Sequence, residues 1–106
     1  MDSDQTIRAL GALAQDHRLA AYRLLVQAGP DGLAAGALAQ TLGVPPSSMS
    51  FHLAQLSNAG LVAQRRVSRS LIYSADFAAM NSLIGYLTEN CCAGADCGAA
   101  ALSDCA

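Results

Sequence analysis

The chain contains no lysine and no tryptophan, and β-branched residues are few among its 106 residues. Alanine and leucine supply much of its 53% hydrophobic content, a bias that favours helix over sheet and suffices for one small core. No apolar run approaches the roughly 20 residues that a membrane-spanning helix needs. The chain opens with Met-Asp-Ser-Asp, so we expect no secretory signal. These features predict a cytoplasmic protein with reduced thiols and no membrane partner.

Positive charge is scarce and concentrated in one place. The formal net charge is −2, and all six basic residues are arginines. Three of them, Arg65, Arg66 and Arg69, fall within five residues, whereas from Asp76 onward the chain has acids and no cation. An acidic body with one basic strip is compatible with DNA binding, because the local field governs contact with phosphates.

The spacing of apolar residues predicts two helices before residue 29. The first, over residues 4–15, is marked by apolar residues at helical spacing, namely Ile7, Leu10, Leu13 and Ala14. Asp16 is placed to cap the second, which has apolar residues around most of its circumference and should be central. The Gly-Pro-Asp-Gly sequence at residues 29–32 then predicts a tight turn.

Two further helices are joined by a short turn. Gly43 suits a left-handed stop for the third helix, and proline can open the fourth at about Pro46. The fourth helix is expected to run to residue 59 and to bury Met49, Leu53 and Leu56. Two short helices connected in this way predict a helix-turn-helix.

A hairpin and a fifth helix follow. Residues 61–66 and 70–74 form two short strand-like runs, and Asp76 is placed to cap the last helix. One apolar face of that helix, expected to join the core, contains Phe77, Met80, Ile84 and Leu87. A second face, with Leu83 and Tyr86, has no partner in so small a chain and is assigned to a dimer interface. The whole order predicts a mainly α (α+β) winged helix-turn-helix with N- and C-terminal dimerisation helices.

The start of the fourth helix carries the residues expected to read DNA. Ser47, Ser48 and Ser50 lie where a recognition helix meets base edges and phosphates, and Phe51 is placed to touch thymine methyl groups. The alternative is that the serines cap the helix and Phe51 packs locally. His52 falls on the buried side and is expected to be a partly buried structural residue.

Arg65, Arg66 and Arg69 converge on the turn of the hairpin, directly after the recognition helix. A wing of this kind reaches phosphates or the minor groove. A merely solvated hairpin is the alternative, but three arginines without an interleaved acid disfavour it in a chain so poor in cations.

The assembled pattern resembles the ArsR/SmtB family of metalloregulatory repressors over roughly residues 5–90. The resemblance implies a homodimer that binds double-stranded operator DNA and leaves it when an inducer binds. The segments that carry it are Ser-Ser-Met-Ser-Phe-His-Leu-Ala-Gln-Leu at 47–56, Asn-Ala-Gly-Leu-Val at 58–62, Arg-Arg at 65–66 and Ile-Tyr at 72–73.

All four cysteines, Cys91, Cys92, Cys97 and Cys105, lie in the last 16 residues. Soft thiolates select thiophilic ions, and arsenite needs three of them, fewer than the four ligands of a structural zinc site. Cys91, Cys92 and Cys97 supply three, and Cys105 is a doubtful fourth. The sequence Asn-Cys-Cys followed by a nearby third cysteine also resembles certain arsenic repressors. We therefore divide the chain into a DNA-binding and dimerisation domain, 1–90, and an inducer-binding tail, 91–106.

Several alternatives remain open at this stage. The cysteines could form disulfides, bind another soft ion (antimonite, methylarsenite, cadmium or zinc), act as a redox switch, or belong to a disordered appendage. From another class of function, the chain could be a metal buffer or a protein-binding winged helix, although neither needs the wing arginines. No nucleophile, base and orienting residue form a set, so we expect no enzyme and no organic cofactor.

Overall fold

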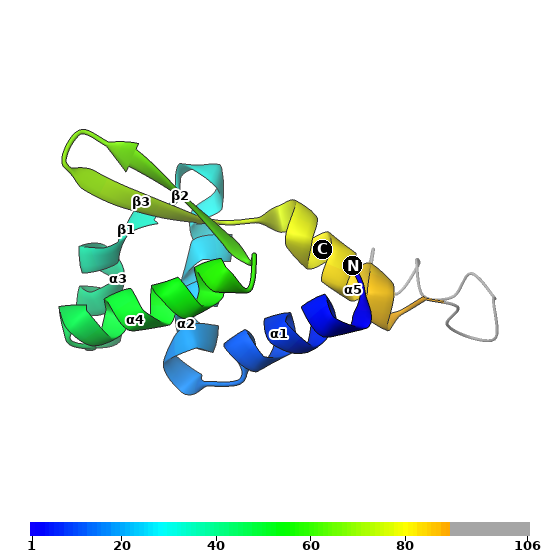
Figure 1. Cartoon of the computed structure of the whole chain (residues 1–106). Coiled ribbons are helices and arrows are strands. Elements are labelled where there is room, and N and C mark those ends of the chain that lie inside the picture. The colour runs from blue at the N-terminus through cyan, green and yellow to red at the C-terminus, as the bar shows by residue number, and fades with distance from the viewer. Residues whose placement is uncertain (90–106) are drawn as a thin grey trace.

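The computed structural model describes residues 1–89, in which five α-helices pack with a small antiparallel sheet (Figure 1). This order of elements confirms the predicted winged helix-turn-helix. None of the described helices is long and apolar enough to cross a membrane. In chain order the elements are α1 (Ser3–Leu13), α2 (Asp16–Ala28), the 3-10 turn η1 (Gly29–Asp31), β1 (Leu33–Ala34), α3 (Ala35–Leu42), α4 (Pro46–Asn58), β2 (Val62–Val67), β3 (Ser70–Ala75) and α5 (Phe77–Leu87).

Local hydrogen bonds and backbone angles set the helix ends. The carboxylate of Asp76 accepts from the backbone N–H of Ala79 at 3.0 Å, which confirms Asp76 as the cap of α5. Gly43 ends α3 with a φ of 65°, as predicted. The cap of α2 is Gln15 and not the predicted Asp16, because the Gln15 side chain accepts from a backbone N–H three residues on.

The sheet has the strand order β1-β3-β2. The hairpin of β2 and β3, residues 62–75, is called the wing below and projects from one side of the molecule (Figure 1). Strand β1 was not predicted, because two residues are too short to leave a periodic signal. It pairs Leu33 and Ala34 with Tyr73 and Ile72 of β3. The wing is therefore joined to the body through β3, and β2 is the outer strand.

The core lies between α2, α3, α4 and the base of the wing. The stripe predicted for α4 is confirmed, since Met49, Leu53 and Leu56 are fully buried. They pack in one cluster with Leu25 of α2 and Leu38 of α3. Each such side chain stabilises the fold by roughly 1.5–3 kcal/mol. This burial fixes which face of α4 points to solvent.

The apolar stripe that marks α1 lies mostly on its exposed side, although Leu13 packs against the core. Ile7 is 65% exposed and Leu10 is also exposed, whereas the buried residues of α1 are Thr6, Ala9 and Ala12. Small alanine side chains allow α1 to lie close against its neighbours, so the core accepts the smaller face. Hydrophobic spacing picks out the larger residues, so it identifies the helix but not the face of it that is buried.

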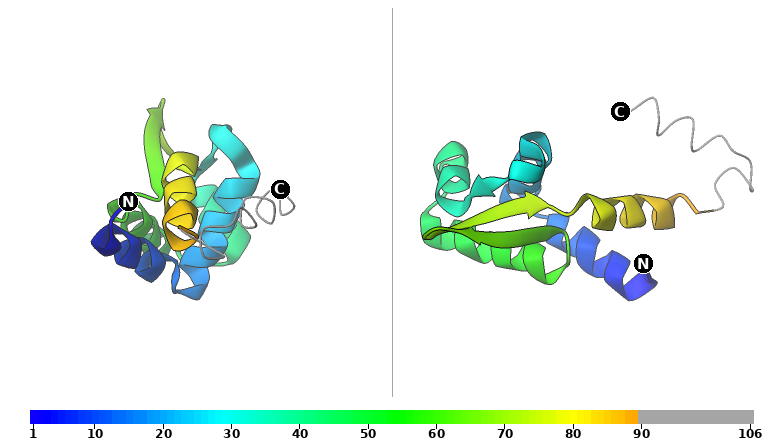
Figure 2. Two further views of the ribbon diagram at one scale, coloured as in Figure 1. Left: turned by 90° about the vertical axis from the view of Figure 1, so that its right-hand side faces the viewer. Right: turned by 90° about the horizontal axis from the view of Figure 1, so that it is seen from above.

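The faces predicted for α5 are wrong in part. Leu83, assigned to a dimer interface, is only 3% exposed and joins the core of the single chain. Of the face expected inside, Met80 packs against the core, whereas Phe77 and Leu87 are exposed and Leu87 reaches 55%. Helices α1 and α5 extend together from the end of the molecule opposite the wing tip (Figures 1 and 2). Their exposed apolar residues therefore lie at one end of the protein, away from the wing tip.

Candidate nucleic-acid interface

The solvent face of α4 carries most of the residues predicted to read DNA. Ser47 and Ser50 are exposed, Phe51 is 58% exposed, and Ser48 is half-buried beside them. The capping alternative for the serines is wrong, because the cap of α4 is Pro45 and no side chain bonds to the first turn. The serine hydroxyls at the exposed positions are therefore directed to solvent at the start of this helix.

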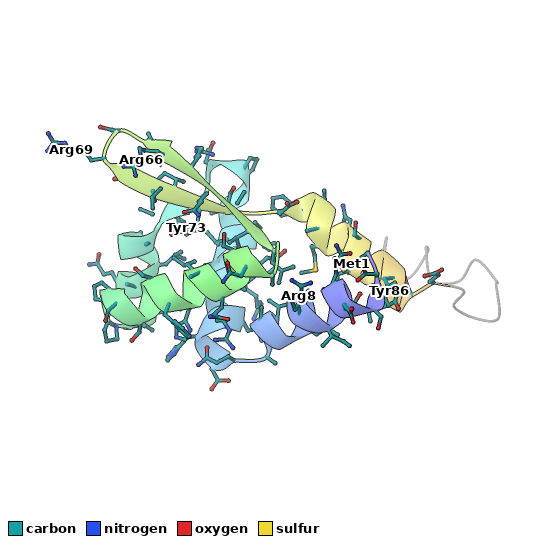
Figure 3. All side chains as sticks on the ribbon, viewed as in Figure 1. Met1, Arg8, Arg66, Arg69, Tyr73 and Tyr86 are labelled. Atoms are coloured by element: carbon teal, nitrogen blue, oxygen red, sulfur yellow. The ribbon has the colours of Figure 1, made fainter. Side chains whose placement is uncertain are left out.

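The register of the wing separates its two neighbouring arginines. Arg65 lies opposite Ile72, and Arg66 lies opposite Leu71. Because successive side chains of a strand point to opposite faces, the two guanidinium groups leave the wing on different sides. Arg69 lies in the turn after Ser68, which has a positive φ of 58°. Figure 3 shows Arg69 at the outer end of the wing and Tyr73 between the wing and α4.

A cleft of about 380 Å³ lies between the wing, α4 and the start of α3. Ser50 comes from α4, Arg66 and Arg69 come from the wing, and none of the lining residues is acidic. The α3 terminus adds partial positive charge, since Ala34 provides no side-chain cap for its free N–H groups. The cleft is suited to an anionic group. Its lining residues are Ala34, Ala35, Gly36, Ser50, Arg66, Arg69, Ser70, Leu71 and Tyr73.

Arg65 makes different contacts. Its Nη1 donates to the carbonyl oxygen of Pro30 at 3.1 Å, and its Nη2 donates to that of Asp31 at 2.9 Å. Sequence reasoning grouped Arg65 with Arg66 and Arg69, because adjacency along the chain does not reveal which face of the strand each one takes.

Comparison with known proteins matches this arrangement. The model of a helix-turn-helix domain family matches residues 13–65, which include both α3 and α4. Nodulation protein NolR of Rhizobium meliloti is 32% identical over 88 residues, which cover 83% of this chain and 70% of NolR. The chain belongs to the ArsR family of helix-turn-helix transcriptional regulators.

Two solved structures of ArsR-type regulators are similar throughout the fold. One is the homodimeric winged helix-turn-helix DNA-binding domain of a possible ArsR-family regulator from Mycobacterium bovis. It has 30% identity and a TM-score of 0.65, with 82% of this chain and 81% of that one covered. The other is an ArsR-like regulator from Rhodococcus sp. RHA1, with 27% identity, a TM-score of 0.68, and coverage of 97% and 93%. These relatives are transcriptional regulators and not enzymes.

A pair of histidines, His52 of α4 and His17 of α2, connects the recognition helix of this ArsR-family chain to α2. His52 is half-buried, as predicted, and its buried Nδ1 has no hydrogen-bond partner within residues 1–89. Its ring centroid lies 5.5 Å from that of His17 of α2, and the Phe51 ring meets it edge-on at 6.0 Å. Burial lowers the pKa of His52 below its usual 6.5, and the charges of Arg18 and His17 add to this effect.

The His52 environment predicts a pH-dependent loss of stability. Below pH 6.5 the unfolded chain takes up a proton that the folded His52 resists, so the free energy of unfolding should fall as the pH drops. We expect chemical unfolding at pH 7.5 and 5.5 to show this fall, and His52→Gln to reduce it. His17→Gln should reduce it less, because it keeps the buried His52 ring and removes only the smaller contribution of the His17 charge. An identical pH dependence in the wild type and His52→Gln would contradict the assignment.

The predicted inducer ligands Cys91, Cys92 and Cys97, and the doubtful Cys105, lie outside the described residues. Within residues 1–89, no three His, Cys, Asp or Glu side chains are grouped so that they could hold a metal ion. The ligand assignment therefore rests on the chemistry of the tail sequence.

Proposed function

We propose that this ArsR-family protein is a cytoplasmic, homodimeric repressor that binds double-stranded operator DNA and releases it when trivalent arsenic binds cysteine thiolates. The observation that carries the DNA-binding part is the cleft where Ser50 of α4 meets Arg66 and Arg69 of the wing. Two guanidinium groups beside a recognition helix are the arrangement that neutralises phosphates while base edges are read in the adjacent groove.

In this proposal, α4 enters the major groove and the wing follows the backbone. Ser47 and Ser50 hydrogen-bond to base edges, and exposed Phe51 contacts thymine methyl groups. Ser48, half-buried next to them, faces the edge of the groove. Small side chains at the start of α4 let its backbone approach the DNA closely.

Phosphate contacts from the wing and base contacts from α4 should affect DNA affinity in different ways. Replacing Arg66 and Arg69 together by alanine should weaken binding to any sequence and lower the salt slope by about one unit per lost phosphate contact. Replacing Ser47 and Ser50 by alanine should weaken operator binding more than random-DNA binding, by roughly 0.5–1.5 kcal/mol for each single hydrogen bond that is lost. Fluorescence anisotropy at several salt concentrations on both DNAs measures this. Equal losses on both DNAs for the serine variant would remove the serines from base reading.

The dimer is proposed to form through α1 and α5. Ile7 and Leu10 of α1, with Phe77 and Leu87 of α5, are exposed on two helices that lie in contact. Water contact with so many large apolar side chains at one end is unfavourable, and a second copy removes it. The similar M. bovis domain is itself homodimeric.

A charged side chain introduced at this apolar end should dissociate the dimer into monomers. We expect Ile7→Glu or Leu87→Glu to weaken the dimer by at least roughly 100-fold, because each would bury an unpaired carboxylate. Val26→Glu, at an exposed apolar position of α2, is the matched control and should stay dimeric. Leu83→Glu should unfold the chain, since Leu83 is in its core. Sedimentation showing an intact dimer in both Ile7→Glu and Leu87→Glu would place the interface elsewhere.

The inducer part of the proposal rests on the ligand count of the tail. Cys91, Cys92 and Cys97 supply the three thiolates that trivalent arsenic takes. Antimonite and methylarsenite share this demand, whereas cadmium or zinc favours four ligands and would require Cys105. A thiol-redox switch would use the same residues without any ion.

A further inference from the structure

The contact of Arg65 links the wing to a distant part of the chain. Strand β2 carries Arg65 on the sheet face opposite the one that carries Arg66. Its two donors meet the carbonyl oxygens of Pro30 and Asp31, more than 30 residues earlier in the sequence. Two parallel N–H···O bonds from one planar guanidinium hold both position and orientation.

These carbonyls are the last two of a short 3-10 turn. Helix α2 ends at Ala28, where Gly29 leaves the helical conformation with a φ of 75° and a ψ of −159°, and η1 (Gly29–Asp31) follows. The hydrogen bond that closes η1 uses the carbonyl of Gly29, so the carbonyls of Pro30 and Asp31 still need donors. Arg65 supplies one donor to each of them from the wing and therefore caps this turn.

Because of the position of β2 in the sheet, the Arg65 contact can hold the outer strand of the wing in place. Strand β3 is held on one side by β1, but β2 is the outer strand and its other edge has no strand beside it among residues 1–89. Residues 63–71 are exposed, so the outer half of the wing has little packing of its own. One row of paired residues crosses the sheet from Arg65 of β2 through Ile72 of β3 to Ala34 of β1. The side chain of Arg65 adds a second attachment of the outer strand to the body, through its contacts with η1.

We propose that Arg65 is a positioning residue that fixes the angle of the wing, and that Arg66 and Arg69 carry the phosphate contacts. This inference rests on the proposed operator binding. The apparent Kd equals the intrinsic Kd divided by the fraction of molecules whose wing is correctly placed. Without the cap that fraction falls, although the charge that faces the DNA is unchanged.

Three variants separate positioning from phosphate contact. Arg65→Lys keeps the charge but cannot make the paired contact, Arg65→Ala removes both, and Arg66→Ala is the matched control on the other face. In anisotropy titrations with operator DNA, we expect Arg65→Lys and Arg65→Ala to weaken binding about three- to ten-fold. Their salt slope should stay within about half a unit of wild type, whereas Arg66→Ala should lose about one unit per contact.

Hydrogen exchange of the free protein tests the same inference without DNA. The amides of β2 and β3 should exchange faster in both Arg65 variants and at the wild-type rate in Arg66→Ala. Three results would each overturn the inference. Arg65→Lys could bind the operator as tightly as the wild type, or Arg65→Ala could lose as much salt slope as Arg66→Ala. The amides of β2 and β3 could also exchange in Arg65→Ala at the wild-type rate. If the wild type binds no DNA, the proposed function fails, and exchange alone decides the role of Arg65.

Discussion

Serine at position 91, 92 or 97 is expected to leave operator binding intact and to abolish its release by arsenite. Each substitution removes one of three thiolates, and a hydroxyl is a poor ligand for a soft ion. A drop of 10- to 100-fold in operator affinity on induction requires only about 1.4–2.8 kcal/mol of coupling. Losing one ligand should therefore keep the protein on DNA in the presence of arsenite. Operator titrations of each variant with and without arsenite measure the effect.

Cys105→Ser is the matched control and should release normally, because the three-thiolate site does not need it. The sequence position of the cysteines suggests a route to the DNA-binding elements. Helix α5 ends at Leu87, four residues before Cys91, and it contacts α1 at the proposed dimer interface. A change at this end of α5 would alter the angle between two recognition helices, which the spacing of half-sites restricts. Release of the Cys97→Ser repressor at wild-type arsenite concentrations would make this assignment wrong, and Cys105 would become the third ligand.

Replacing Gly32 by alanine is expected to destabilise the fold by roughly 2–4 kcal/mol, a fall in Tm of about 10 °C or more. Gly32 has a φ of +70°, and an added Cβ would collide with the backbone oxygen of Tyr73 and approach Cγ2 of Ile72. Both belong to β3, where it pairs with β1. The close approach of these backbones therefore requires glycine at this position.

Gly43→Ala provides the comparison for Gly32→Ala. Gly43 has a φ of +65°, but an added Cβ would have no neighbour within 4 Å. The free energy of unfolding should therefore fall by only about 1–2 kcal/mol, because alanine introduces backbone strain at this φ but no collision. Calorimetry measures the loss of stability in both variants, and the difference between the two losses is the part that the collision with β3 causes. Equal losses of stability would show that β1 and β3 separate easily. Gly32→Ala should also loosen the wing, since Gly32 follows the carbonyls that Arg65 caps.

The helix-turn-helix could be predicted from the sequence because its signals are local. Gly43 must be left-handed, Pro46 can stand only in the first turn of a helix, and Asp76 caps a helix through its own side chain. The buried stripe of α4 has no competing apolar stripe, so its spacing identifies the correct face. The candidate DNA-reading residues followed directly from that face.

The parts that could not be predicted depend on contacts between distant segments. Helices α1 and α5 each have two apolar faces, and the packing of Ala9 and Leu83 decides which one enters the core. The pairing of β1 with β3 joins residues about 40 positions apart. The Arg65 contacts likewise depend on where the wing folds back toward η1. Neither local spacing nor composition contains this information.

One titration tests the central claim most directly: the purified protein against the DNA upstream of its own gene, with and without arsenite. We predict binding that is tighter than to random DNA of the same length and composition, and a 10- to 100-fold loss of affinity when arsenite is added. Equal affinity for the two DNAs would contradict operator recognition. Specific binding that arsenite leaves unchanged would contradict arsenic as the inducer.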